Sequence, residues 1–320
     1  MRVLITGGTG FVGSHLAEAY LDRGDKVDVL DIGSMMKVKH LMERTGFTLY
    51  PESVFNQEML DSLIMKADLV YHLAAVVGVE HYVADPYAVL NVNVNGTQAV
   101  LQTAHKYGTK VVFASTSEVY GRNPKVPWSE DDDRVLGSTR IDRWCYSTSK
   151  AVGEHFCWAF MKKGLPVVVT RYFNAYGPRL DAVDVGRVIT IFMGQVLRNE
   201  PVTVIGDGSQ TRCFTYISDT VKATVEAGLN PNAEGEIVNI GNDTETTILE
   251  LAEAMIRVSG ARSEVKLVPK ESIYGESYED IQRRVPDITK MKTLLGVAPE
   301  VSLEDGLKAT IEWFKSNAKL

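Results

Sequence analysis

Cysteine, long hydrophobic runs and excess positive charge are all scarce in this 320-residue sequence. The three cysteines, Cys145, Cys157 and Cys213, are odd in number and form no CxxC pair, which argues against a disulfide framework or a thiolate metal site. No apolar run approaches the roughly 20 residues that a transmembrane helix needs. A formal net charge of -7 argues against broad electrostatic contact with nucleic acid or an anionic membrane. These absences favour a globular protein of the reducing cytoplasm.

Signatures of several other classes are missing as well. The six histidines show no HExxH or comparable ligand spacing, so no metal is predicted. The sequence has no GxSxG elbow, which argues against a serine hydrolase. Residues 1–5 already look like a buried strand, and we therefore expect no signal peptide.

Short β-branched runs alternate with longer amphipathic stretches in the first half of the chain. This alternation predicts an α/β fold of the Rossmann type, a doubly wound parallel sheet with helices on both faces. The predicted strands are Arg2–Thr6, Lys26–Leu30, Leu69–His72, 110–114 and 166–171.

Prolines punctuate shorter elements after about Arg171, which predicts a smaller second lobe. We expect a Rossmann domain over residues 1–170 and a smaller C-terminal substrate-binding lobe over residues 171–320. A segment near residues 210–240 is expected to return to the first domain, with a strand at 236–240, so the division is discontinuous.

A glycine-rich turn follows the first predicted strand, with Gly7, Gly10 and Gly13 at its corners. Such a turn lets the backbone bend tightly and approach a pyrophosphate, while the helix that follows offers free N–H groups to the phosphates. The second strand ends at Asp31, where a carboxylate can accept hydrogen bonds from both ribose hydroxyls. No arginine follows nearby to bind a 2′-phosphate, so NAD is favoured over NADP.

Tyr146 and Lys150 are four residues apart, and on a helix they share one face. A lysine cation there, beside a positive nicotinamide ring, would lower the pKa of the phenol toward working pH. Hydroxyl groups and the Glu118 carboxyl cluster in residues 115–121, where a parallel strand should end. Ligands of doubly wound sheets bind at such strand ends.

The motifs GGTGFVG, LAA, NVNGT, STSEVYG, YSTSK and RYFNAYGP occur in this order over nearly the whole chain. Together they resemble the extended short-chain dehydrogenases that modify nucleotide sugars. The resemblance implies that Tyr146 is the proton acceptor, Lys150 its partner, and Thr116 a hydroxyl that bonds the sugar. It also implies that NAD contacts Gly7, Thr9, Gly10, Phe11, Val12, Gly13, Asp31, Ile32, Leu73, Ala74, Ala75, Asn93, Ser115, Tyr146, Lys150 and Tyr172.

Within this family the chain looks most like UDP-glucuronate decarboxylases. The resemblance rests on Arg143 before the tyrosine, on Glu118, and on the segments GPRLD, GRVI, GDGSQTR and RRVPD. It implies catalytic roles for Ser117, Glu118 and Arg284 beside Thr116, Tyr146 and Lys150. A UDP-sugar would contact Glu118, Arg143, Asn174, Arg187, Val188, Thr203, Arg212, Tyr278 and Arg284.

The implied reaction is oxidation of the sugar at C4, loss of CO2 from the resulting β-keto acid, and return of the hydride to give a UDP-pentose. The main alternative is a 4-epimerase acting on UDP-glucuronate or UDP-glucose. A 4,6-dehydratase usually carries Asp-Glu where this chain has Ser117 and Glu118. A non-catalytic NAD-binding protein is the remaining alternative, against which the intact Thr116, Tyr146 and Lys150 argue.

A homodimer is expected from residues 156–161, an apolar run that covers every face of its helix. One face can pack on the sheet, and the remainder needs another surface.

Overall fold

The computed structural model describes residues 1–269 and 281–317 of the chain. Seven parallel strands form the central sheet, in the order β11-β6-β5-β4-β1-β2-β3. They are β1 Arg2–Thr6, β2 Lys26–Leu30, β3 Phe47–Tyr50, β4 Leu69–His72, β5 Lys110–Thr116, β6 Val167–Tyr172 and β11 Ile237–Ile240. The predicted Rossmann-type α/β fold is confirmed.

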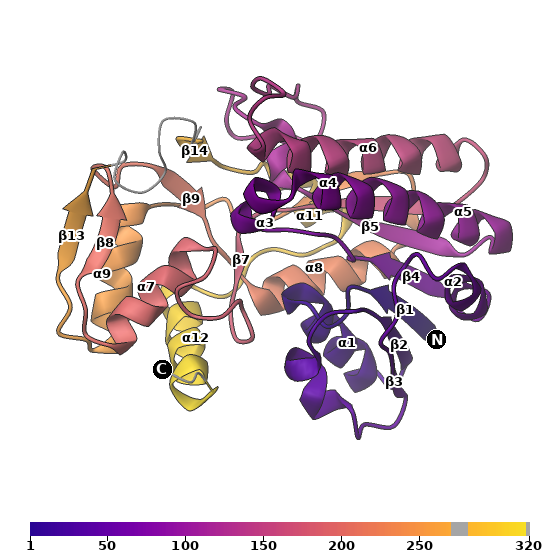
Figure 1. The fold of residues 1–320 in the computed structure, drawn as a ribbon, viewed down its shortest axis with the longest axis horizontal. Coiled ribbons are helices and arrows are strands. Elements are labelled where there is room, and N and C mark those ends of the chain that lie inside the picture. Colours follow the sequence, from indigo (N-terminus) through magenta and orange to yellow (C-terminus); the bar gives the residue numbers. More distant parts are fainter. Residues whose placement is uncertain (270–280, 318–320) are drawn as a thin grey trace.

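Helices cover both faces of this sheet because its side chains alternate between two apolar cores (Figure 1). One core joins the sheet to α1 and α8, and the other joins it to α2, α5 and α6. The helices associated with the sheet are α1 Phe11–Asp22, α2 Gln57–Ile64, α3 Val79–Ala84, α4 Pro86–Leu90, α5 Thr97–Tyr107, α6 Arg143–Met161 and α8 Ile217–Leu229, with the 3-10 helices η1 Met35–Leu41 and η3 Ser117–Tyr120 and the π-helix η2 Asn91–Gly96.

A second group of smaller elements lies beside the carboxyl ends of these strands, at the left of Figure 1. It contains small sheets that pair β10 with β7, β13 with β8, and β12 and β14 with β9. Its elements are β7 Ala175–Tyr176, α7 Val188–Leu197, β8 Val202–Ile205, β9 Thr211–Cys213, β10 Thr215–Tyr216, β12 Glu245–Thr247, α9 Ile248–Ser259, β13 Val265–Val268, β14 Arg283–Arg284 and α12 Leu303–Asn317. Two further short helices, α11 Thr289–Leu294 and the 3-10 helix η4 Pro231–Ala233, lie beside β11 and α8 of the large-sheet group.

The chain crosses between the two groups more than once. α8 packs on α1, and β11 pairs with β6 at the edge of the large sheet, although both follow the first elements of the second group. β3 was not among the predicted strands, because its side chains are at most half-buried and show little apolar alternation. Among the described residues, no helix is both long and apolar enough to cross a membrane.

Candidate active site

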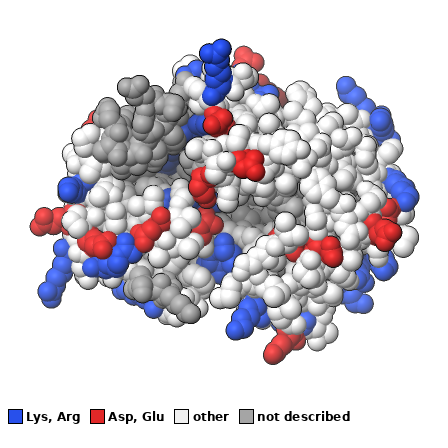
Figure 2. Space-filling view, viewed as in Figure 1, with Lys and Arg blue, Asp and Glu red and all other residues white. Residues whose placement is uncertain are grey.

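A cleft of about 2030 Å³ lies between the large sheet and the second group of elements. The space-filling view shows the surface hollowed there, with charged side chains of both signs along its left side (Figure 2). A pocket for one small ligand is usually about 300–1,000 Å³, so this cleft has room for two ligands. It begins beside β1 and β4, where the strand order reverses and doubly wound sheets bind dinucleotides.

The glycine turn after β1 leaves its backbone open to close approach by a ligand. A Cβ on Gly7, whose φ is +73°, would lie 2.5 Å from the backbone nitrogen of Ala74. A Cβ on Gly13 would lie 2.5 Å from the Gly7 carbonyl oxygen. α1 begins after Gly10 without a side-chain cap among the described residues, so its first N–H groups face the cleft. This cradle fits the pyrophosphate of a dinucleotide.

Asp31 follows β2 at the rim of the same cleft. One carboxylate oxygen accepts hydrogen bonds from the Thr9 backbone N–H at 2.9 Å and the Thr9 hydroxyl at 2.6 Å. The other accepts from the Gly33 backbone N–H at 2.9 Å. These bonds fix the orientation of the carboxylate, which suits it to accept the hydroxyls of a cofactor ribose.

Tyr146 and Lys150 lie on α6 and face the end of β5. Thr116 lies close enough to Tyr146 to favour the ionised phenol, and the Lys150 ammonium group donates to the Ala114 carbonyl at 2.8 Å. Burial and the negative charge of Glu118 raise the pKa of Tyr146 to about 12, against the lowering expected from the sequence. Burial also lowers the pKa of Lys150 to about 8. The phenol is therefore protonated at neutral pH until further positive charge comes beside it.

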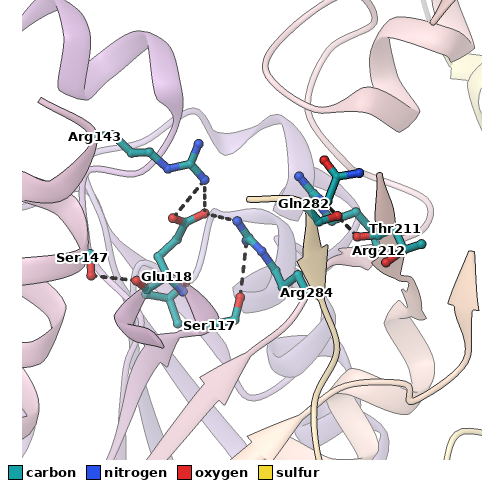
Figure 3. A network of polar contacts seen from close by, with 9 residues as sticks. Ser117, Glu118, Arg143, Ser147, Thr211, Arg212, Gln282 and Arg284 are labelled. Carbon is teal, nitrogen blue, oxygen red and sulfur yellow. Dashed lines mark hydrogen bonds and ion pairs between the residues drawn. The ribbon is translucent and has the colours of Figure 1, made fainter. Parts of the chain in front are cut away.

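Glu118 lies between two buried arginines from different parts of the chain (Figure 3). Its carboxylate accepts from Arg143 Nη2 at 3.2 Å and from Arg284 Nη2 at 2.6 Å. Burial alone would raise the pKa of Glu118, but the two guanidinium groups outweigh it and hold the pKa at about 2. Arg284 also reaches Ser117 Oγ at 3.4 Å. Glu118 is thus ionised at neutral pH and acts through its charge.

The second group of elements brings further predicted residues to the cleft. Arg187 pairs with Asp181 at 3.0 Å, and its guanidinium carbon lies 6.0 Å from the centre of the Phe11 ring. Arg212 sits next to Arg284 in the pairing of β9 with β14. Other predicted residues that line the cleft are Val12, Ile32, Leu73, Ala75, Asn174, Val188 and Thr203.

Four of the predicted site residues differ from the others, because three have polar groups that bond other parts of the protein and one lies outside the described residues. Asn93 is buried and bonds the backbone of Val76 and the hydroxyl of Ser149, so it supports the cleft wall from behind. Ser115 and Tyr172 line the cleft, but their hydroxyls bond Glu154 and Thr224. Tyr278 lies outside the described residues.

Four further residues line the cleft without having been predicted as site residues, namely Lys37, Asp181, Gln210 and Gln282. Asp181 and Gln210 lie in the segments GPRLD and GDGSQTR, which contribute to the resemblance but gave these two residues no role. Lys37 and Gln282 lie in segments whose local sequence gives no sign of their position.

Comparisons with known proteins agree with this geometry. The model of the "NAD dependent epimerase/dehydratase family" matches residues 3–241. A UDP-N-acetyl-alpha-D-glucosaminuronate decarboxylase of Bacillus cytotoxicus is 42% identical over 98% of both chains. UDP-glucuronic acid decarboxylase 1 of Danio rerio is 40% identical over 98% of this chain and 72% of its own. The crystal structure of a UDP-glucuronic acid 4-epimerase from Bacillus cereus, in complex with UDP-glucuronic acid and NAD, is 32% identical, covers 99% of each chain and has a TM-score of 0.88.

Proposed function

This chain belongs to the NAD-dependent epimerase/dehydratase family, and we propose that it removes CO2 from a UDP-hexuronate, with UDP-glucuronate as the main candidate. The observation that carries the proposal is the Glu118 carboxylate held between the buried guanidinium groups of Arg143 and Arg284. This cluster lines the same cleft as Tyr146 and Thr116. The sugar would therefore meet acid–base and charged groups together.

The cluster carries one more positive than negative charge in a buried place, which suits a substrate carboxylate. Arg284 Nε is buried and has no hydrogen-bond partner in the part of the chain that the structure describes. A buried guanidinium with a spare donor is strongly favoured to bind an added carboxylate oxygen. Arg284 is thus the proposed contact of the sugar carboxylate.

Tyr146 is the proposed base that takes the proton of the sugar 4-hydroxyl, with Thr116 beside the same phenol. When bound, NAD would supply hydride transfer to and from C4, and its positive nicotinamide ring would favour the Tyr146 phenolate. The Lys150 ammonium, held on the Ala114 carbonyl at 2.8 Å, adds positive charge from behind. Removing one proton and one hydride leaves a ketone at C4.

A ketone at C4 lies β to the C6 carboxylate of the sugar. When the C5–C6 bond breaks, its electron pair moves into an enolate at C4 and C5, and CO2 leaves. Protonation at C5 restores the ketone, and return of the hydride and a proton gives the pentose. The proposed roles of Tyr146 and Thr116 would bring their hydroxyls beside the enolate oxygen, where they would stabilise it.

A UDP-glucuronate 4-epimerase is the second candidate, favoured by the likeness to the Bacillus cereus structure. Such an enzyme would make the same ketone, rotate it and reduce its other face with the carboxylate retained. The greater identity to decarboxylases, 42% and 40% against 32%, favours decarboxylation.

Product identification tests the proposal. Purified protein is incubated separately with UDP-glucuronate, UDP-N-acetylglucosaminuronate and UDP-glucose, and the products are identified by mass spectrometry and NMR. We expect a UDP-pentose, or its 2-acetamido counterpart, from at least one acid and no change in UDP-glucose. UDP-galacturonate as the product would favour the epimerase, and epimerisation of UDP-glucose alone would assign the arginines another role.

The proposed NAD contacts are those predicted from the sequence, with Asn93 acting through Val76. The proposed UDP-sugar contacts remain Glu118, Arg143, Asn174, Arg187, Val188, Thr203, Arg212, Tyr278 and Arg284. We also keep the division into residues 1–170 and 171–320 as a proposal, with α8 and β11 as the returning segment.

A homodimer through α6 in the cytoplasm completes the proposal. Cys157 is fully buried, and Phe156, Trp158 and Phe160 already pack partly against the core, which leaves less of the run uncovered than expected. Met161 is 37% exposed and half-buried aromatic edges remain beside it. Light scattering at micromolar concentration should give twice the mass of one chain; a monomer mass would refute the dimer.

A further inference from the structure

The contact between Glu118 and Arg284 requires two separate segments to keep a fixed distance. Glu118 lies on η3, and Arg284 is the last residue of β14. Their side chains meet at 2.6 Å, so a shift of about 1 Å between the segments would break the hydrogen bond. The two segments must therefore be held together by other residues.

Asn239, on the edge strand β11, joins three segments of the chain through one amide. Its side chain is fully buried, and its oxygen accepts a hydrogen bond from the Tyr120 hydroxyl at 2.7 Å. Its nitrogen donates to the carbonyl of Trp128 at 2.9 Å and to that of Asp287 at 3.1 Å. A primary amide has two N–H donors, and both are used here, so these bonds fix the orientation of the amide.

Two of these three segments carry the charged pair. Tyr120 is the last residue of η3 and comes two residues after Glu118. Asp287 comes three residues after Arg284. The amide of Asn239 thus connects the backbone that carries the carboxylate with the backbone that carries the guanidinium group.

Trp128 makes a second connection between the same segments. Its backbone N–H donates to the Val285 carbonyl at 2.8 Å, and its carbonyl accepts from the Asp287 backbone N–H at 2.8 Å. Its indole ring is fully buried and stacks on the Tyr120 ring, with the ring centres 5.1 Å apart. Displacement of Tyr120 would therefore also disturb the segment that follows β14.

Arg171 connects this arrangement to α6, the helix that carries Tyr146 and Lys150. Its guanidinium group donates to the Tyr120 hydroxyl at 2.9 Å and pairs with Glu154 of α6 at 2.7 Å. Both charged side chains are buried. A buried polar network favours a single arrangement when each member is bonded, so the elements around the sugar end share one support.

We propose that Asn239 is a positioning residue that sets the distance between Glu118 and Arg284, with Tyr120 as its link to Glu118. Asn239 does not line the cleft and acts through the two charged residues. The inference rests on the proposed function for its ligand, a sugar carboxylate received by Arg284. The distance between the charged groups can be measured without that ligand.

Two substitutions test this role. Kinetics use UDP-glucuronate or UDP-N-acetylglucosaminuronate, whichever the wild-type protein converts. Tyr120→Phe keeps the stacked ring and should lower kcat/KM about two- to tenfold, the effect of losing one neutral hydrogen bond. Asn239→Leu removes the donor to two buried carbonyls and should lower kcat/KM at least about tenfold. Calorimetry should show weaker binding of the UDP-hexuronate and unchanged binding of UDP, which has no carboxylate.

Tyr71→Phe is the matched control. Tyr71 is fully buried like Tyr120, and its hydroxyl bonds the Tyr20 hydroxyl at 2.6 Å and the Thr224 carbonyl at 3.2 Å. Both substitutions should lower the free energy of unfolding, but only Tyr120→Phe should lower kcat/KM. Equal losses of kcat/KM would show that a general loss of stability explains the effect, and would overturn the inference.

A double-mutant cycle adds a readout that a merely structural role would not change. In the Arg284→Ala background, Asn239→Leu should lower kcat/KM much less than in the wild type, because the side chain that it positions is absent. Full multiplication of the two separate effects would overturn the inference. Melting temperatures establish that each variant is folded.

A wild-type kcat/KM in folded Tyr120→Phe or folded Asn239→Leu would also overturn it. If Asn239→Leu does not fold, Tyr120→Phe and its control decide. If the wild-type protein converts neither UDP-hexuronate, the proposed function is wrong, and crystal structures of wild type and Tyr120→Phe test the inference alone. A longer distance between Glu118 and Arg284 in the variant would support it, and an unchanged distance would overturn it.

Discussion

The two ends of the cleft are built in different ways. At the proposed cofactor end, a short run of backbone between Gly7 and Gly13 and one carboxylate, Asp31, line the cleft. At the sugar end, charged side chains from separate elements meet, and Glu118 and Arg284 are 166 residues apart in the sequence. In the proposed function, the main-chain N–H groups would bind phosphate whatever the sugar is, whereas the side chains would discriminate among sugars. Motifs that are contiguous in the sequence therefore identify the family. The proposed reaction depends instead on side chains that only the tertiary structure brings together.

Replacing Tyr146 by Phe removes the proposed acid–base group, on which the reaction at both ends of the cleft depends. We expect turnover to fall about 10²- to 10⁴-fold, as for loss of a general acid–base group. Binding of NAD and of the UDP-sugar should largely survive, because the ring and the charged contacts remain. Steady-state kinetics together with calorimetric binding measure both quantities. An undiminished turnover would mean that another group moves the proton.

Replacing Arg284 by Ala affects the sugar end alone. Loss of a charge-assisted hydrogen bond to the carboxylate should cost about 1.5–3 kcal/mol in kcat/KM, or roughly 10- to 150-fold. NAD binding should be unchanged. Arg283→Ala is the control, because that arginine adjoins Arg284 on β14 but is half-exposed and pairs with Glu245. Equal losses from the two variants would contradict the assignment of the carboxylate contact.

Replacing Asp31 by Ala affects the cofactor end alone. The wild-type protein should prefer NAD to NADP, because the carboxylate repels a 2′-phosphate. The variant should lose about tenfold or more in NAD affinity, since hydrogen bonds to a charged group are worth about 1.5–3 kcal/mol. Its preference for NAD should shrink. Titrations with both cofactors check this, and tight NADP binding by wild type would show that Asp31 does not face the ribose.

The free energy of unfolding should decrease at acidic pH because of His72, a histidine behind the cofactor end of the cleft. His72 is buried between Thr6 and Thr97, and burial lowers its pKa from 6.5 to about 3. The unfolded chain takes up the proton first, so the stabilisation is full above pH 6.5 and declines as the pH falls toward 3. From this group alone we expect the free energy of unfolding to be lower by about 2 kcal/mol at pH 5 than above pH 6.5.

Denaturant unfolding at pH 8 and pH 5 measures this loss. In His72→Gln the difference between the two pH values should shrink, whereas the control His105→Gln, on the surface of α5, should behave like wild type. An unchanged difference in His72→Gln would assign the acid sensitivity to other groups, such as His15.

Most of the sheet could be predicted from the sequence because its buried strands are apolar runs bounded by turns. The cofactor turn could be predicted because its glycines and the helix that follows are contiguous. The meeting of Glu118 with Arg284 was accessible only through resemblance to relatives, since no local pattern relates residues so far apart. GPRLD contributed to the resemblance, but the contacts of Arg179, Lys37 and Asp181 were not predicted, because they depend on how residues 178–187 fold back onto α1 and η1.

The raised pKa of Tyr146 could not be predicted from the local sequence either. The four-residue spacing of Tyr146 and Lys150 indicates a shared helix face, but the lysine bonds the Ala114 carbonyl, and Glu118 adds a negative charge near the phenol. The balance of those charges depends on burial, which spacing does not determine.

The fate of one carbon atom tests the proposed decarboxylation most directly. UDP-glucuronate carrying ¹³C at C6 is incubated with the protein as purified, and ¹³C NMR follows the label without added reductant. The account predicts that the label leaves as CO2 and bicarbonate in step with formation of an unlabelled UDP-pentose. A label that stays in the sugar carboxylate while UDP-galacturonate forms would contradict it.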